Sequence, residues 1–262
     1  SFMFLLQSGL NTVTGDPRLS EERHLQIDAG LDYSDERFSA SGSLFHAWVN
    51  DRITFENLSV RRGPPFGQIE QTNLKYVNTE LATLFGFEAD AEWQLSDSVE
   101  LFGQVSYVEG TDQTRNGNFA TLQAQSLPLT PSQQVAGQPR GAFSGIAGGN
   151  EEPLPGIAPL QSRLGVRLLG DIGDAPFSVE VAARIVDNQN RVASSLLESR
   201  TPGFTVWDTR GVLQMTESIT VFAGVENFTD KNYREHFDFR SQGGQSVRQP
   251  GMNFYFGSQV VY

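Results

Sequence analysis

The chain has 262 residues with 31 acidic and 19 basic side chains, which gives a formal net charge of −12. This acidic balance argues against nucleic acid as a partner, because phosphate recognition depends on clustered Lys and Arg. Cysteine is absent, so the chain has no disulfide or thiolate chemistry. No stretch approaches the roughly 18 consecutive apolar residues that a membrane-spanning helix needs.

Apolar and polar residues alternate with a period of two along most of the chain, which is typical of strands with one apolar face. Segment 85–95 is the clearest case, with Phe, Ala, Trp or Leu at every odd position and Gly, Glu, Asp or Gln at every even one. The pattern predicts an all-β chain. We expect ten strands, the first of them incomplete: 2–7, 25–33, 38–55 (of unassigned parity), 85–95, 99–107, 163–169, 177–185, 204–215, 219–225 and 253–262.

The predicted connections alternate between short and long. The short ones are 34–37, 96–98, 170–176 and 216–218, and the long ones are 9–21, 56–80, 110–158, 187–203 and 227–248. This order indicates a transmembrane antiparallel up-and-down β-barrel with short periplasmic turns, in which 110–158 is a long extracellular loop. The alternative is a soluble antiparallel sheet with one solvent-exposed face, but this alternative does not explain why short and long connections alternate along the chain.

Charged residues fall on the polar face of the predicted strands. They are Asp28, Asp32, Glu88, Asp90, Glu92, Glu100, Arg163, Arg167, Glu180, Arg184, Asp208, Arg210 and Glu226. A Lys or Arg that faces lipid at mid-bilayer costs about 2–4 kcal/mol, so these charges belong in a barrel lumen. Tyr33 and Trp93 end their strands on the apolar face, where interfacial aromatic residues are expected.

The C-terminal part resembles the TonB-dependent outer-membrane receptors. The segment that carries the likeness is Val225-Glu226-Asn227-Phe228-Thr229-Asp230-Lys231-Asn232-Tyr233, which is similar to the family pattern V-x-N-L-F-D-K-x-Y. The last strand ends in Gly257, Val260 and Tyr262, which resemble the terminal signal that the barrel-assembly machinery reads. The usual last residue of that signal is Phe rather than Tyr.

Two further segments agree with the resemblance. Residues 15–22 are similar to the N-P-x-L-K-P-E loop, with Asp16 in place of Asn and with Ser20 and Glu21 in place of Lys-Pro. Residues 154–165 and 202–208 resemble the family's entries into descending strands.

The family barrel has about 22 strands and an N-terminal plug, so the resemblance implies that residues 1–262 are the C-terminal portion of a larger barrel. It also implies location in the bacterial outer membrane, contact with lipids and energy coupling through TonB acting on the plug. No cofactor is expected.

Two sets of residues are candidates for function. One is a lumen set that we expect to face the plug: Arg163, Arg167, Glu180, Arg184, Asp208 and Arg210. Cross-strand pairing of these charges with one another is the open alternative. The other is a loop set suited to an anionic or aromatic metal chelate such as an iron-siderophore complex: Arg61, Arg62, Phe66, Arg234, His236, Phe237, Phe239 and Arg240. For the loop set, the open alternative is that the charged side chains are simply solvated and that the aromatic side chains are interfacial.

Enzymatic residues are scarce. The three histidines are His24, His46 and His236, and only His236 has an acidic residue, Asp238, and serines, Ser241 and Ser246, nearby in the sequence. Polar loops contain such residues by default, so we predict no catalytic residues and no metal site. A self-contained small outer-membrane barrel with hydrolase or porin activity remains the alternative to the receptor.

Overall fold

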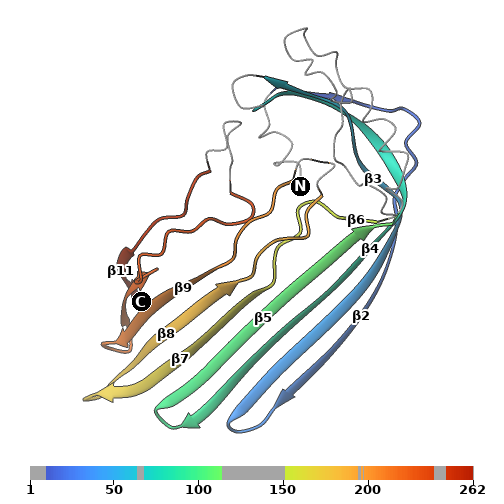
Figure 1. The fold of residues 1–262 in the computed structure, drawn as a ribbon. Coiled ribbons are helices and arrows are strands. Elements are labelled where there is room, and N and C mark those ends of the chain that lie inside the picture. The colour runs from blue at the N-terminus through green and yellow to red at the C-terminus, as the bar shows by residue number, and fades with distance from the viewer. Residues whose placement is uncertain are drawn as a thin grey trace.

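The computed structural model describes residues 10–63, 68–113, 151–193, 196, 198–238 and 246–261, and strands dominate these residues (Figure 1). The strands are β1 (Leu10–Thr14), β2 (Arg23–Ser34), β3 (Phe38–Gly63), β4 (Gln68–Ser96), β5 (Val99–Asp112), β6 (Glu152–Pro153), β7 (Gln161–Ile172), β8 (Ala175–Val186), β9 (Phe204–Gln214), β10 (Ile219–Glu226) and β11 (Asn253–Val260). No helix within these residues is long and apolar enough to cross a membrane.

All eleven strands belong to one sheet, in which β2, β3, β4, β5, β7, β8, β9, β10 and β11 lie side by side in chain order. Each of these strands runs antiparallel to its neighbours. The turns β2–β3, β4–β5, β7–β8 and β9–β10 gather at one end, the short-turn end, and the long connections lie at the opposite, long-loop end (Figure 1). This confirms the antiparallel up-and-down order. The sheet is curved and not closed.

The cross-strand register shows which side chains share each of the two faces of the sheet. Leu44 has Ala29 and Phe87 as its cross-strand neighbours, which assigns the even residues of 40–48 to the apolar face and so settles the parity of this strand. Large side chains on this outer face are solvent-exposed, as for Leu31 (76%) and Phe256 (90%). Tyr33 and Trp93 are also exposed on it, near the short-turn end. The charged residues that the sequence assigned to the polar face lie on the other, inner face.

The predicted long loop 56–80 is wrong. β3 and β4 continue through it as a hairpin, with pairing from Asn50 and Leu81 out to Gly63 and Gln68. Backbone pairing continues here, β1 adds a further strand to β4, and Leu74 packs with Ala193, Leu196 and Phe55, so the strands persist where the two-sided alternation ends. The pairing shifts register between Asn57 and Ser59 and again between Arg61 and Arg62.

The predicted loop 9–21 is also partly wrong, because β1 lies within it. β1 pairs in parallel with the outer part of β4, from Leu10 with Gln71 to Thr14 with Lys75. Of the predicted loop 110–158, the start extends β5 to Asp112, and Glu152 and Pro153 form β6 against it. Residues 114–150 and the predicted strand 2–7 lie outside the described residues.

Glycines on the inner face make room for aromatic rings from the neighbouring strand. Gly86 lies opposite Phe45, and Gly165 lies opposite Phe102. A Cβ at either glycine would come within 2.4 or 2.3 Å of the facing ring. Gly224 with Tyr255 and Gly257 with Phe222 repeat the arrangement on β10 and β11. These pairs cover the bare glycine backbone and help to define the register.

Candidate functional site

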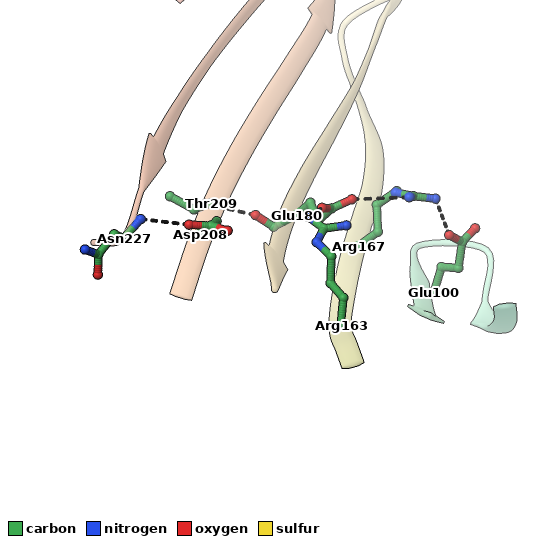
Figure 2. A network of polar contacts seen from close by, with 7 residues as sticks. All are labelled: Glu100, Arg163, Arg167, Glu180, Asp208, Thr209 and Asn227. Atoms are coloured by element: carbon green, nitrogen blue, oxygen red, sulfur yellow. Dashed lines mark hydrogen bonds and ion pairs between the residues drawn. The ribbon is translucent and has the colours of Figure 1, made fainter. Parts of the chain in front are cut away.

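A ladder of ion pairs crosses the inner face from β5 to β8 (Figure 2). The Glu180 carboxylate accepts from Arg163 at 2.5 Å and from Arg167 at 3.2 Å, and Arg167 also pairs with Glu100. Both guanidinium groups lie 5.2 Å from the centre of the Phe102 ring. The register creates the ladder, because Arg167 is directly opposite Glu100 on one side and Glu180 on the other.

The ladder is the cross-strand arrangement that the sequence left open as the alternative to plug contact. It neutralises Arg163 and Arg167 within the sheet. The Arg side chains stay about one third exposed, at 34% and 30%, so each ion pair contributes modestly to stability. Contact between this face and a plug stays a prediction.

Arg184 on β8 differs, because its carboxylate comes from a loop. The guanidinium donates to Glu235 at 2.6 Å and to the Tyr233 hydroxyl at 3.3 Å. It also lies 4.9 Å from the centre of the Phe204 ring, on which Tyr233 packs with ring centres 4.3 Å apart. The segment that carries Tyr233 and Glu235 therefore folds inward over the inner face of β8 and β9.

The last two residues of the predicted lumen set have different surroundings. The Asp208 carboxylate accepts the backbone N–H of Asn227 at 2.7 Å, which ties β9 to the start of the loop after β10 (Figure 2). Arg210 lies opposite Glu180 in the register, and its side chain is exposed. All six residues of the lumen set thus lie on the inner face. Some of them pair with charges on neighbouring strands, some bond the loop after β10, and Arg210 is exposed to solvent.

A polar cleft of about 300 Å³ opens on the inner face beside Arg184. Arg163 and Arg184 lie at one side of the cleft, where they occupy directly opposed positions on β7 and β8. Glu88 and Asp90 line it from β4. Polar side chains from the strands between complete the lining: Gln104, Ser106 and Gln161. The cleft therefore has a cationic and an anionic side.

His236 is buried at the long-loop end. Its Nδ1 lies 2.7 Å from the Thr201 hydroxyl and its Nε2 lies 3.2 Å from Glu198 Oε1. The same Glu198 carboxylate accepts the backbone N–H groups of Gly156 at 2.9 Å and Ala193 at 2.6 Å. One carboxylate thus joins three connections of the chain, 151–160, 187–203 and 227–252.

The burial of His236 contradicts its expected place on a ligand surface. The imidazole is used inside the loops, and Asp238 is used locally, because it accepts from the Glu235 backbone N–H at 2.6 Å and from Gln249 at 2.8 Å. Sequence reasoning missed Glu198, Thr201 and Glu235. No local pattern marks them, since their partners lie 35 to 51 residues away.

The remaining loop candidates are scattered. Phe237 is exposed and packs edge-on beside His236, with ring centres 5.2 Å apart, and Arg234 is half-buried. The backbones of Arg61 and Arg62 lie at the end of β3, by the second register shift. Phe66, Phe239 and Arg240 lie outside the described residues. Among the described residues no group of three His, Asp or Glu side chains is placed to hold a metal ion.

The family-like segment 225–233 builds a tight turn around Asn227, which has a positive φ of 49°. Its buried amide donates to the Lys231 carbonyl at 2.9 Å and to the Pro250 carbonyl at 3.3 Å, and it accepts the Lys231 N–H at 2.8 Å. Asp230, at φ 52°, accepts the Met252 N–H at 3.1 Å. The polar residues of the motif thus lock β10 to the approach of β11.

The segment 15–22 forms a second locked turn. The Asp16 carboxylate accepts from the Arg18 guanidinium and backbone and pairs with Lys75 of β4 at 2.8 Å. The Arg18 guanidinium, with Lys75, holds the pKa of the Asp16 carboxyl well below its usual range. Further along, Ser20 bonds Asn78, and Glu22 accepts the Ile53 N–H at 2.6 Å.

At the C-terminus, the predicted assembly residues take different environments. Gly257 lies beneath the Phe222 ring on the inner face, and Val260 lies half-exposed on the outer face opposite Ile219. Tyr262 is outside the described residues.

The fold and this charged inner face define a piece of an outer-membrane-type receptor barrel. A family model described as TonB dependent receptor-like, beta-barrel, matches residues 4–228, and the chain belongs to this family. No curated protein sequence matches it.

Solved structures with the same fold agree. The copper transporter OprC has a TM-score of 0.69 and 22% identity over 93% of this chain and 32% of its own. The FrpB iron transporter from Neisseria meningitidis has a TM-score of 0.57 and 13% sequence identity, and the match covers 97% of this chain and 33% of that chain. The ferric yersiniabactin uptake receptor FyuA from Yersinia pestis has a TM-score of 0.53 and 14% sequence identity, and the match covers 91% of this chain and 30% of that chain. The chain thus spans about a third of their length. They are named as transporters and receptors.

Proposed function

We propose that the protein to which this chain belongs is an outer-membrane receptor that takes up a scarce small ligand by TonB-dependent active transport. The observation that carries the proposal is the continuous two-sided sheet of a TonB-dependent receptor barrel, with an exposed apolar outer face and a charged inner face. A lipid-facing exterior and a polar lumen require this division of residues.

The ligand that fits best is an anionic metal chelate of the iron-siderophore kind. Arginine recognises carboxylate and similar anionic groups through paired hydrogen bonds, and the inner face carries four arginines on β7, β8 and β9: Arg163, Arg167, Arg184 and Arg210. Two of the similar structures are named for iron or a ferric chelate. Arg234 and Phe237, with Arg61, Arg62, Phe66, Phe239 and Arg240, are the proposed loop contacts.

Three partners follow from the same proposal. The TonB complex acts through an N-terminal plug, which contacts the charged inner face of the barrel. The barrel-assembly machinery reads Gly257, Val260 and Tyr262 on the last strand. Lipids contact the outer face.

Uptake by the full-length protein tests the proposal. Cells that lack other receptors are supplied with radiolabelled ferric chelates, copper(II) and cobalamin, with and without TonB. We expect accumulation of a ferric chelate that stops when TonB is deleted or the proton gradient is collapsed. Uptake that persists without TonB would instead indicate a passive pore, and failure with every ligand in the panel would remove the chelate proposal.

A further inference from the structure

An apolar groove of about 600 Å³ lies on the outer face, across β8, β9, β10 and β11. Its floor is formed by Gly211 and Ala223, which are cross-strand partners on β9 and β10. Val179 of β8 and Phe256 of β11 flank this floor in the same cross-strand row. The groove therefore runs between larger apolar side chains over a floor of glycine and alanine.

The floor of this groove is not covered by the side chains around it. A Cβ at Gly211 would have only the Ala223 carbonyl oxygen within 4 Å, at 4.0 Å, whereas the glycines of the inner face lie beneath aromatic rings. The Phe177 ring at the edge of the groove lies over Gly170 of β7 instead, where a Cβ would come within 2.9 Å of the ring. An unfilled void loses dispersion contacts, and a flexible apolar chain restores them.

The groove reaches the short-turn end of the sheet, where its surroundings are acidic. Ile172, the last residue of β7, lines it, and the β9–β10 turn that joins its two floor strands carries the exposed Glu217. Neither this turn nor the β7–β8 turn has a Lys or Arg, whereas the β2–β3 turn has Arg37. The polar end of the groove therefore complements a headgroup with a free ammonium group and disfavours a lipid with a net negative charge.

We propose that the groove binds one phospholipid of the periplasmic leaflet, a glycerophospholipid with a zwitterionic ethanolamine headgroup. One acyl chain lies over Gly211 and Ala223, and the ammonium group lies beside Glu217. The floor strands β9 and β10 are inside the sheet rather than at its edge, so the site does not depend on what pairs with β11. The inference rests on the proposed function only in placing the outer face against lipid and the short turns on the periplasmic side.

The test is native mass spectrometry of the purified full-length protein, released from nanodiscs that contain equal amounts of phosphatidylethanolamine and phosphatidylglycerol with the same acyl chains. We expect the wild-type protein to retain one phosphatidylethanolamine molecule and little phosphatidylglycerol. Gly211→Leu fills the floor of the groove, so the retained lipid should fall by about five-fold or more, because the leucine replaces the acyl chain in its dispersion contacts. Ala223→Leu fills the same floor from β10 and replaces this variant if Gly211→Leu does not fold.

The headgroup preference is tested separately, at the polar end of the groove. Glu217→Lys should lower the preference for phosphatidylethanolamine over phosphatidylglycerol by about two- to five-fold, the range of an exposed ion pair. Glu36→Lys makes the same change in the exposed β2–β3 turn, at the same end of the sheet but away from the groove. This variant should keep the preference of the wild type.

The control for the floor is Gly42→Leu. Gly42 lies on the outer face of β3, between Leu31 and Ala89, and a Cβ there would have only the Glu88 carbonyl oxygen within 4 Å, at 3.9 Å. This variant should retain the lipid as the wild type does.

The proposal is overturned if the wild type retains the two lipids equally, if both groove variants retain the lipid, or if Gly42→Leu loses it as they do. A co-purified polypeptide that is lost in Gly211→Leu would assign the groove to a protein partner and would also overturn it. TonB-dependent uptake that persists when the wild type shows no lipid preference would leave the proposed function intact. Selective lipid retention without any uptake would contradict the function and not the lipid site.

Discussion

His236 Nε2 and Glu198 Oε1 lie 3.2 Å apart, and each side chain is only 1% exposed. This buried contact joins the loop after β10 to the loop between β8 and β9. Through its two backbone acceptor bonds, Glu198 also holds Gly156 and Ala193. The described parts of these three connections therefore pack together, and a small core of Leu74, Ala193 and Leu196 lies at the same end of the sheet.

The first prediction concerns this contact. His236→Ala should lower the free energy of unfolding by about 1–3 kcal/mol, because the buried Glu198 and Thr201 lose a hydrogen-bond partner. His236→Gln should lose less, since its amide can donate to Glu198 and accept from Thr201. Urea unfolding of the full-length protein in detergent measures both. His24→Ala, at an exposed position of β2, is the control, and equal stability of His236→Ala and His24→Ala would contradict a structural role.

Asn227 provides a second prediction, in which backbone conformation and hydrogen bonding are separated. Asn227→Gly keeps the positive φ and loses three hydrogen bonds, whereas Asn227→Ala also strains the backbone. We expect a loss of about 1–3 kcal/mol for Ala and a smaller loss for Gly. Thermal unfolding, monitored by gel mobility, ranks the stabilities of the two variants. Exposed Asn232→Ala should change little, and a Gly variant less stable than Ala would show that φ does not matter here.

The ion-pair ladder predicts unequal roles for its two carboxylates. Glu180→Gln leaves Arg163 and Arg167 without their shared partner, whereas Glu100→Gln affects Arg167 alone. Glu180→Gln should therefore destabilise the barrel more, by about 1 kcal/mol given the exposure of the arginines. Urea unfolding at low and high salt measures the difference, which should shrink as salt screens the charges. A larger effect of Glu100→Gln would disagree with the ladder.

The turn at Asp16 predicts a dependence on pH. The folded-state pKa of this carboxyl lies below its usual value of 3.8, so the contact with Arg18 and Lys75 is fully present above that value and is lost as the pH falls below it. The stability difference between wild type and Asp16→Asn should be constant from neutral pH to about 5 and should shrink below about 4. Asp174→Asn, in the exposed β7–β8 turn, is the control. A difference that disappears above pH 5 would exclude the ion pair as its cause.

Adjacent residues of β3 test the assignment of faces. Leu44 is 50% exposed on the outer face, and Ser43 lies on the inner face. Leu44→Arg should cost about 2–4 kcal/mol near mid-bilayer and reduce assembly, because a charge would face lipid. Ser43→Arg should be tolerated, since it enters a polar lumen beside Glu88. The heat-modifiable, folded fraction in outer-membrane extracts measures assembly, and the reverse order would exchange the two faces.

The strand pattern was predictable because face assignment is a local property. Successive side chains of a strand alternate, so 85–95 and 25–33 reveal their apolar sides without knowledge of any neighbour. The family-like segments were readable for a similar reason: Asn227 bonds Lys231 four residues away, and Asp16 bonds Arg18 two residues away.

The extended hairpin and the loop contacts were not predictable in this way. Beyond Asn50 and Leu81 the partner of each strand supplies the hydrogen bonds, and the polar sequence carries no periodic signal of that pairing. β1 is a strand only because β4, about 60 residues later, accepts it.

The sequence by itself determined which residues of the clearly alternating strands share the apolar face and which share the polar face, since that follows from the two-residue repeat of a strand. Only the tertiary structure decided that Arg184 meets Glu235 and that His236 meets Glu198. Those pairs depend on where loops of the chain return in space, and separations of 51 and 38 residues leave no trace in local spacing.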